Sequence, residues 1–229
     1  IDINSNLKID VKKIFLDSEY YLSNFKGDIL IKNKEIYKAD LIGSFSKNKK
    51  LKLTINKDNN NKITTLFVDE AKPIVKRYKF IKGFDEGSLD FFSSKKSKKS
   101  VSQIKIYDFK LKELPILTKI LTLASLQGIA DILSGEGIRF TEFEMNFKNE
   151  GDLTKIIADL TIGKGPFKDT YKSDVVFNKN KDSIFVKNLE GPLNHLSNNW
   201  NFVDKENGIT EVTFDIDFEI KNKFLNSLM

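Results

Sequence analysis

Cysteine is absent from this 229-residue chain, and histidine is represented by His195 alone. Without cysteine, the chain can form neither a disulfide-stabilised scaffold nor a thiolate metal site. A single histidine also cannot assemble a histidine-based metal cluster. No carboxylate-rich motif with calcium-binding spacing occurs in the sequence. These absences exclude the common protein-held metal centres, so we predict no metal ion.

Arginine is almost as scarce, because only Arg77 and Arg139 occur and lysine supplies the remaining positive charge. The net charge of +6 is unevenly distributed. From Thr154 onward ten lysines face eleven acidic residues, which gives about −1 there and about +7 before it. Nucleic-acid-binding proteins favour arginine for bidentate contacts to bases and phosphates. The basic charge is therefore weak evidence for nucleic-acid binding, and we predict no DNA partner.

Catalytic motifs are also missing. Ser134 lacks the glycine two residues earlier that a nucleophile elbow requires, and residues 163–166 are too short for a phosphate-binding loop. Asp215, Asp217 and Glu219 alternate along one predicted strand, which is typical of a solvent-facing stripe rather than a catalytic pair. We therefore predict a binding or carrier protein with no catalytic residue and no cofactor, not an enzyme.

Short alternating apolar segments are what the chain has in quantity. Hydrophobic residues make up 40% of it and include 19 phenylalanines, enough for a core in one large β domain or two small ones. The absence of α/β alternation predicts an antiparallel sheet, whose apolar face would suit a lipid groove as well as an ordinary core. The predicted strands include residues 29–31, 51–55, 63–68, 104–109, 140–147, 175–177, 184–186, 200–202 and 212–220. Polar turns are predicted at residues 33–34, 48–49, 58–61, 178–182 and 204–208.

One segment, residues 114–134, is strongly helical in character. Pro115 and Ser134-Gly135 mark its start and end. Lys119 and Asp131 argue against insertion into a bilayer, where a charge costs several kcal/mol. We expect an amphipathic helix lying on the sheet, with membrane contact as the alternative. Its apolar side chains recur at three- and four-residue spacing: Leu117, Ile120, Leu121, Ala124, Ile129, Ile132 and Leu133.

The sequence around this helix resembles the AsmA-like C-terminal region of large bacterial envelope proteins, a family that includes TamB-type lipid conduits. The resembling blocks are GFDEGSLDFF (83–92), QIKIYDFKLKELP (103–115), LTKILTLASLQGIADILSGEGI (117–138) and RFTEFEMNF (139–147). Residues 1–82 fit the same family as generic strand repeats. The resemblance implies lipid contact or transport at the bacterial inner membrane, on its periplasmic side.

A second resemblance runs from Ile156 to the end of the chain. ADLTIG (158–163) with YKS (171–173), LEGPLNHLSNNWNF (189–202) and VTFDIDFEIKN (212–222) resemble the second half of a coenzyme Q-binding, START-like protein of the RatA type. The opening strand and short helices of that family are absent here. The resemblance implies ubiquinone as a bound ligand, a location at the cytoplasmic face of the membrane, and ribosome association as a lesser alternative.

The START-like resemblance places the lipid or quinone against one group of side chains on the last predicted strands. His195, near Trp200, could donate to a quinone carbonyl, although a surface histidine is the favoured interpretation. A polyketide-cyclase-like enzyme ranks last, because no acid–base pair stands in a pocket-like context. The predicted lipid- or quinone-contacting residues are Leu193, Trp200, Phe202, Phe214 and Phe218.

A lysine cluster among serines is the candidate membrane-facing site. We interpret it first as a solvated loop between strands. Its alternative is contact with anionic lipid headgroups, worth about 1 kcal/mol per lysine near such a surface. The cluster consists of Lys95, Lys96, Lys98 and Lys99.

The resemblances together predict an α+β chain made mainly of antiparallel β structure. It would comprise a curved sheet with one long amphipathic helix (114–134), then an incomplete START-like (helix-grip) β meander. The predicted domains are 1–153, AsmA-like, and 154–229, partial coenzyme Q-binding START-like. The chain begins with Ile1 rather than methionine, and the join of two unlike halves indicates a chimera or a fragment of something longer. The predicted function is non-enzymatic lipid contact or transport in the cell envelope, with ubiquinone binding as the alternative.

Overall fold

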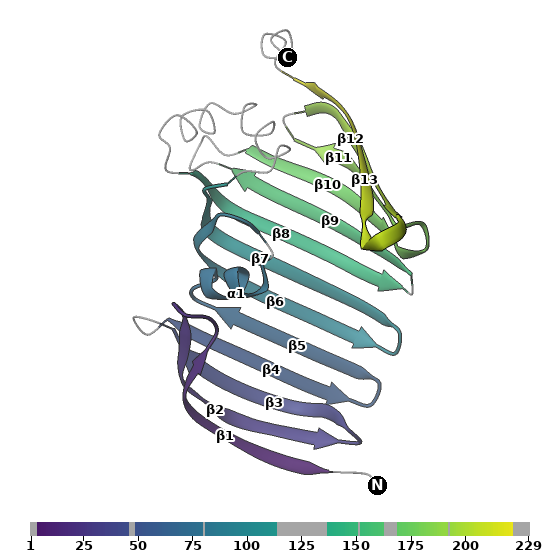
Figure 1. Cartoon of the computed structure of the whole chain (residues 1–229). Coiled ribbons are helices and arrows are strands. Elements are labelled where there is room, and N and C mark those ends of the chain that lie inside the picture. The colour runs from purple at the N-terminus through teal and green to yellow at the C-terminus, as the bar shows by residue number, and fades with distance from the viewer. Residues whose placement is uncertain are drawn as a thin grey trace.

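The chain folds into one continuous antiparallel sheet in the computed structural model, which describes residues 4–45, 49–79, 81–113, 137–150, 152–162, 169–191 and 193–221. Thirteen strands form the sheet, and each is hydrogen-bonded to the strand that follows it in the sequence. Figure 1 shows this order as a ladder from β1 near the N-terminus to β13 near the C-terminus. The prediction of antiparallel pairing is therefore confirmed.

The strands are 8 to 13 residues long, and several are joined by tight turns. They are β1 (Ser5–Phe15), β2 (Tyr21–Lys32), β3 (Glu35–Ser44), β4 (Lys50–Asp58), β5 (Asn61–Val68), β6 (Phe84–Lys96), β7 (Lys99–Leu111), β8 (Ile138–Glu150), β9 (Leu153–Ile162), β10 (Asp169–Asn178), β11 (Ser183–Glu190), β12 (Leu193–Asp204) and β13 (Thr210–Ile220). Among the described residues, the helical elements are α1 (Lys72–Tyr78) and two single 3-10 turns, Lys179–Lys181 and Glu206–Gly208.

Turn chemistry explains several of these hairpins. Asn33 and Lys34, which link β2 to β3, both have positive φ values of 51° and 63°. Two-residue hairpins of this kind match the twist of the flanking strands, and asparagine tolerates the left-handed region better than most residues. Asn59 and Asp182 adopt the same region in the turns after β4 and β10. The turns predicted at 33–34, 58–61 and 178–182 therefore lie where the sequence places them.

Alternation along the strands gives the sheet one apolar face, which we call the inner face. Successive side chains of a strand point to opposite faces, and the register aligns apolar residues of neighbouring strands. The opposite, outer face carries charged side chains in register, and Lys105 there forms an ion pair of 2.8 Å with Glu144. One inner-face row, the core row, joins Leu51, Val68, Leu89, Ile106, Phe143, Leu160 and Tyr171 on seven consecutive strands.

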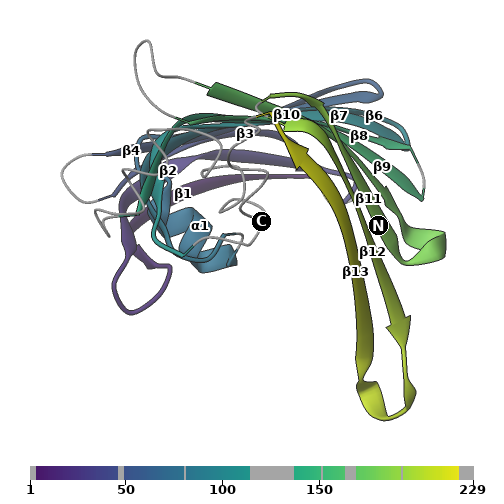
Figure 2. The same ribbon diagram turned by 90° about the horizontal axis from the view of Figure 1, so that it is seen from above.

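The short helix α1 packs on the inner face near the middle of the sheet (Figures 1 and 2). Proline in its first turn favours the helical start, and Lys79 ends it in the left-handed conformation. Ala71 and Val75 are buried in the same cluster as Phe109 and Phe140, whose stacked rings lie 5.0 Å apart. Each such large apolar side chain contributes about 1.5–3 kcal/mol when buried. The largest buried cluster among the described residues therefore lies between α1 and the central strands.

The sheet is curved rather than flat. In Figure 2 it arches over α1, and the β12–β13 hairpin bends toward the same side. β-Bulges bend a strand and increase its local twist, and the pairing contains several such irregularities. They include those between Ser23 and Lys26 in β2, between Phe140 and Glu142 in β8, and between Leu193 and His195 in β12.

The predicted fold class is wrong. The described residues form one sheet with a single seven-residue α-helix, not an α+β fold with one long helix and a separate helix-grip part. The strands β8 and β9 pair across residues 150–153, so the START-like part continues the same sheet. The predicted helix 114–134 lies outside the described residues, and the packing of its Leu117 stripe stays a prediction. Among the described residues, no helix has the length and apolar character needed to cross a bilayer.

Candidate functional site

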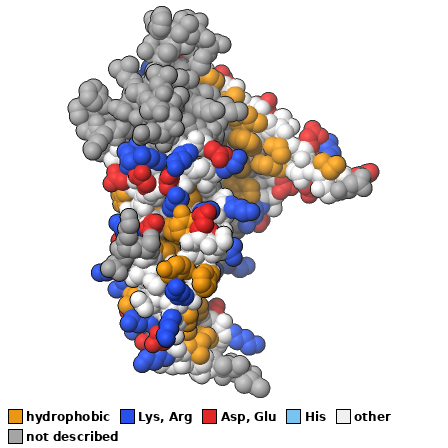
Figure 3. All heavy atoms as spheres, turned by 60° about the vertical axis from the view of Figure 1, so that its left-hand side comes forward, with side chains coloured by type: hydrophobic (Ala, Val, Ile, Leu, Met, Phe, Trp, Pro, Cys, Tyr) orange, Lys and Arg blue, Asp and Glu red, His pale blue; other side chains and the backbone are white. Residues whose placement is uncertain are grey.

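The inner face is the candidate site, because its apolar side chains form continuous rows across many strands. The row next to the core row, which we call the apolar row, is only partly buried. Neighbouring strands lie about 4.8 Å apart, so this row extends about 24 Å along the sheet. Figure 3 shows hydrophobic side chains following this side of the molecule toward the β12–β13 hairpin, bordered by lysines. The apolar row consists of Leu53, Leu66, Phe91, Ile104, Met145 and Ala158.

The five predicted lipid- or quinone-contacting residues lie on β12 and β13, and the structure separates them into two groups. Leu193, 2% exposed, packs with Phe218 in a small apolar cluster that also contains Tyr171 and Leu196. The other group is aromatic: the Trp200 and Phe214 rings lie 4.2 Å apart, with Phe202 on the next paired row. The Trp200 indole donates a 3.0 Å hydrogen bond to Asn198. Both groups lie on the inner face, because the register of β11, β12 and β13 continues its rows of paired residues.

His195 lies on the opposite face. Its Nε2 atom is 2.9 Å from a carboxylate oxygen of Asp217, and both side chains are exposed. The predicted acidic stripe of Asp215, Asp217 and Glu219 is likewise exposed, whereas Phe218 beside it is half-buried. The histidine therefore does not face the apolar groups that a quinone ring would contact.

Sequence reasoning missed Tyr171, the polar side chain buried in the β10–β13 cluster. Its hydroxyl has no hydrogen-bond partner among the described residues. Burial raises the pKa of Tyr171 to about 12, so the group is a neutral donor near neutral pH. A buried polar group without a partner costs about 1–3 kcal/mol, which makes the hydroxyl available to an acceptor. The YKS block (171–173) was the only sequence signal that pointed here.

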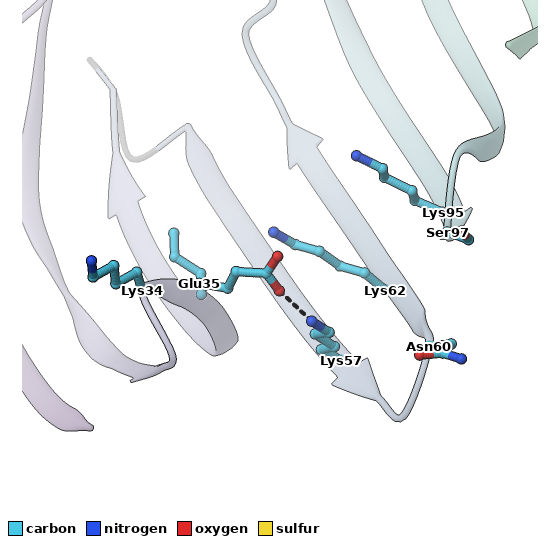
Figure 4. Close-up of a pocket in the computed structure, with 8 residues that line it drawn as sticks. Lys34, Glu35, Lys57, Asn60, Lys62, Lys95 and Ser97 are labelled. Atoms are coloured by element: carbon cyan, nitrogen blue, oxygen red, sulfur yellow. Dashed lines mark hydrogen bonds and ion pairs between the residues drawn. The ribbon is translucent and has the colours of Figure 1, made fainter. Parts of the chain in front are cut away.

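Lysines line a hollow of about 520 Å³ at one edge of the inner face, where the β2–β3, β4–β5 and β6–β7 turns lie (Figure 4). Glu35 is the one carboxylate among its lining residues, and it forms an ion pair with Lys57. The hydrogen bond that Glu35 accepts from Lys57, together with the nearby charges of Lys62 and Lys95, holds the pKa of Glu35 below its ordinary value. The lining residues are Lys34, Glu35, Ile36, Lys57, Asn60, Lys62, Lys95 and Ser97.

Only one member of the predicted lysine cluster lines this hollow. Lys95 lies near the end of β6 and faces the hollow, together with Lys62 on the neighbouring strand. Lys96 and Lys99 pair across the β6–β7 hairpin, and Lys98 lies in its turn. All four are exposed, at the tip of the hairpin that joins β6 and β7.

Ser134 and residues 163–166 lie outside the described residues. Within the described ranges, no group of three or more histidine or acidic side chains is placed to hold a metal ion.

Residues 144–229 match a family model described as polyketide cyclase / dehydrase and lipid transport. The match supports the START-like resemblance and begins within β8, before the domain boundary predicted at residue 154. Comparison with curated proteins and with solved structures gives no match. The AsmA-like resemblance of residues 1–153 and the domain boundary stay predictions. The chain is thus similar, over its last third, to a family described in part by lipid transport.

Proposed function

We propose that the inner face binds the hydrocarbon part of a lipid, and that the chain is a non-enzymatic lipid carrier. The observation that carries this proposal is the apolar row, which runs unbroken from Leu53 on β4 to Ala158 on β9. Apolar surface removed from water gains about 25 cal/mol per Å². A hydrocarbon chain lying along partly exposed rows would bury its own surface and theirs, without any bond being made or broken.

The lipid-transport description of the matched family supports the same role. The groups on the middle of the inner face are hydrocarbon and hydroxyl side chains, such as those of Phe91, Ile104 and Ser93. These groups do not exchange protons readily near neutral pH, so the proposal includes no reaction. The proposed location is the periplasmic side of the bacterial inner membrane, which rests on the AsmA-like resemblance, or the cytoplasmic face if the START-like part governs it.

The proposal is tested with a fluorescent fatty acid whose emission rises in apolar surroundings. We expect saturable binding to the wild-type chain and about fivefold weaker binding to Ile104→Gln, which places an amide in the apolar row. Val101→Gln on the same strand is the matched control, since Val101 is 50% exposed on the outer face. Equal binding by both variants, or no saturable binding by the wild type, would contradict the proposal.

Ubiquinone binding by the START-like part is the second candidate, and Tyr171 is the observation that favours it. A quinone carbonyl could accept the unused hydrogen bond of the Tyr171 hydroxyl, with Leu193 and Phe218 beside the ring. The test is quenching of Trp200 fluorescence by a short-chain ubiquinone. Saturable quenching that becomes weaker in the Tyr171→Phe variant would favour quinone binding. The lipid proposal predicts no saturable quenching.

A further inference from the structure

Three lysines occupy one inner-face position on three adjacent strands. Lys57 on β4 lies directly opposite Lys62 on β5, and Lys62 lies directly opposite Lys95 on β6. We call these residues the lysine rim. Like charges directly opposite each other on neighbouring strands are destabilising. An anion bound between these lysines would offset that cost.

The lysine rim is only partly neutralised by the protein. Glu35 pairs with Lys57, while no described carboxylate lies within ion-pair distance of Lys62 or Lys95. The hollow is therefore lined by four lysines and one glutamate, an excess of three positive charges. Figure 4 shows Lys62 extending toward the carboxylate of Glu35, with Lys95 on the neighbouring strand pointing in the same direction as Lys62. An anion in the hollow would relieve the repulsion that the register imposes.

Behind the lysine rim, the inner face becomes less polar in a fixed order. One step inward, two residues along β5 and β6, stand Thr64 and Ser93, and Ser102 on β7 continues this row, which we call the hydroxyl row. On β4 the residue one step inward from Lys57 is Ile55. The Ser102 hydroxyl donates a 2.8 Å hydrogen bond to that of Ser93. Another step inward lies the apolar row, and each step is about 6.7 Å along the strand. Charge, hydroxyl and hydrocarbon thus follow one another within about 13 Å.

A lysine pair on the outer face shows that opposed charges alone do not make such a site. Lys148 on β8 lies directly opposite Lys155 on β9, and both are exposed. Along the same strands the outer face next carries Asn146 and Ile157 and then Glu144 and Asp159, so charge returns where the inner face has a hydrocarbon row. The lysine rim differs from this pair because it borders a hollow and because hydroxyl and then hydrocarbon side chains follow it along the strands.

We infer that the lysine rim binds the phosphate headgroup of an acidic amphiphile whose linker lies on the hydroxyl row and whose tail lies on the apolar row. This inference rests on the proposed function and specifies its ligand and the ligand's orientation. The headgroup of the lipid lies at the β2–β3, β4–β5 and β6–β7 turns, and its tail is directed toward α1.

The experiment measures the affinity of the folded chain for three probes: palmitoyl lysophosphatidic acid, uncharged monopalmitin and inorganic phosphate. The two lipids share a glycerol linker and a tail and differ in the headgroup. We expect the wild type to bind the lysophosphatidic acid at least tenfold more tightly than monopalmitin, with the ratio falling as salt rises. Inorganic phosphate should bind weakly, because it has no tail.

The variants are Lys62→Ser/Lys95→Ser and the matched outer-face control Lys148→Ser/Lys155→Ser, which removes the same charge. The first should lower the affinity ratio about tenfold and leave monopalmitin binding unchanged, and the control should leave both unchanged. Circular dichroism and thermal melting establish that each variant is folded. An unchanged ratio in the first variant, or an equal loss in the control, overturns the inference.

The failures of the two proposals are distinguishable. If monopalmitin and the lysophosphatidic acid bind the wild type equally and saturably, the headgroup inference is overturned while lipid binding stands. If neither lipid binds saturably, both are overturned. If inorganic phosphate binds as tightly as the lysophosphatidic acid, the site takes a free anion, and the headgroup inference is overturned.

Discussion

The rings of Trp200 and Phe214 lie 4.2 Å apart on the inner face of the β12–β13 hairpin, and Trp200 is the only tryptophan in the chain. Its fluorescence therefore reports on this end of the sheet alone. In Figure 2 the hairpin stands at the margin of the arch, apart from α1. The indole thus marks the boundary between the apolar rows and solvent, which makes it a probe of whether the START-like part holds a ligand.

A short-chain ubiquinone is expected to quench Trp200 only weakly and without saturation in this chain. Phe214, which packs against Trp200, is 37% exposed, so the described residues leave these rings on an open apolar surface, whereas ligand sites usually enclose most of the ligand. A fluorescence titration measures this directly, with free tryptophan as the reference for collisional quenching. Saturable quenching at micromolar quinone would instead favour the quinone alternative.

Replacing Tyr171 by phenylalanine should not destabilise the fold, although Tyr171 is 6% exposed. Its hydroxyl has no partner among the described residues, so the change removes a desolvated polar atom whose burial costs about 1–3 kcal/mol. We expect the variant to melt at the same temperature as the wild type or higher. Leu196→Ala in the same cluster, which should cost about 2–5 kcal/mol, is the comparison.

The Tyr171 hydroxyl also predicts a dependence on alkaline pH. Because burial raises its pKa to about 12, the folded state holds the proton more tightly than the unfolded chain, where the value is about 10. The free energy of unfolding therefore does not depend on this group below about pH 10 and falls as the pH rises from about 10 toward 12. Tyr171→Phe should therefore unfold less steeply with pH in that window. Identical pH profiles for the two proteins would contradict this.

Asp85 is expected to make stability depend on acid pH. Hydrogen bonds from Lys112 and Lys72 hold its pKa well below the ordinary value, and the carboxylate lies 2.6 Å and 2.7 Å from the two ammonium groups. A carboxyl whose pKa is lowered by folding stabilises the fold above the unfolded value. That stabilisation is lost as the pH falls below about 4.

Asp85→Asn should accordingly cost about 1–2 kcal/mol at pH 7, since Lys112 is largely exposed and its contribution is screened. The difference from the wild type should shrink between pH 4 and pH 2 in denaturant unfolding. Asp90→Asn is the control, because burial raises the pKa of Asp90 and removing that charge should not destabilise the fold. Equal losses for both variants at pH 7 would show that the ion pairs of Asp85 contribute nothing.

Binding to anionic vesicles should depend on Lys95 more than on its neighbours in the hairpin. Lys95 faces the hollow, whereas Lys96 and Lys98 lie at the hairpin tip. In liposome flotation at low salt, Lys62→Ser/Lys95→Ser should reduce binding more than Lys96→Ser/Lys98→Ser, although each variant loses two charges. Physiological salt should weaken binding by the wild type. An equal loss of vesicle binding in the two variants would show that binding depends on net charge and not on the position of Lys95.

Much of the sheet could be predicted from the sequence because its signals are local. Residues 104–109 and 212–220 alternate between apolar and polar side chains, and both segments are strands. The helix α1 was missed because seven residues span only two turns, too few for a helical period to emerge. Pro73 followed by Val75 was the signal that could have indicated it.

The remaining features depend on register, which a sequence does not display. The turn predicted at 58–61 already implies that Lys57 faces Lys62, but the place of Lys95 depends on how β5 pairs with β6 across α1. The helix-grip prediction failed for a similar reason. The residues that resemble a START-like protein do form strands. However, the pairing of β8 with β9 joins these strands to the preceding ones in one long sheet.

Photo-crosslinking at Phe91 and Phe92 tests the central claim most directly. These neighbours on β6 point to opposite faces, Phe91 in the apolar row and Phe92 on the outer face at 43% exposure. A photoreactive benzoylphenylalanine at either position preserves the aromatic character of the side chain. After irradiation with a palmitoyl lipid, mass spectrometry should find the lipid attached at position 91 and not at 92. Equal labelling at both positions, or labelling at 92 alone, would contradict a lipid-binding inner face.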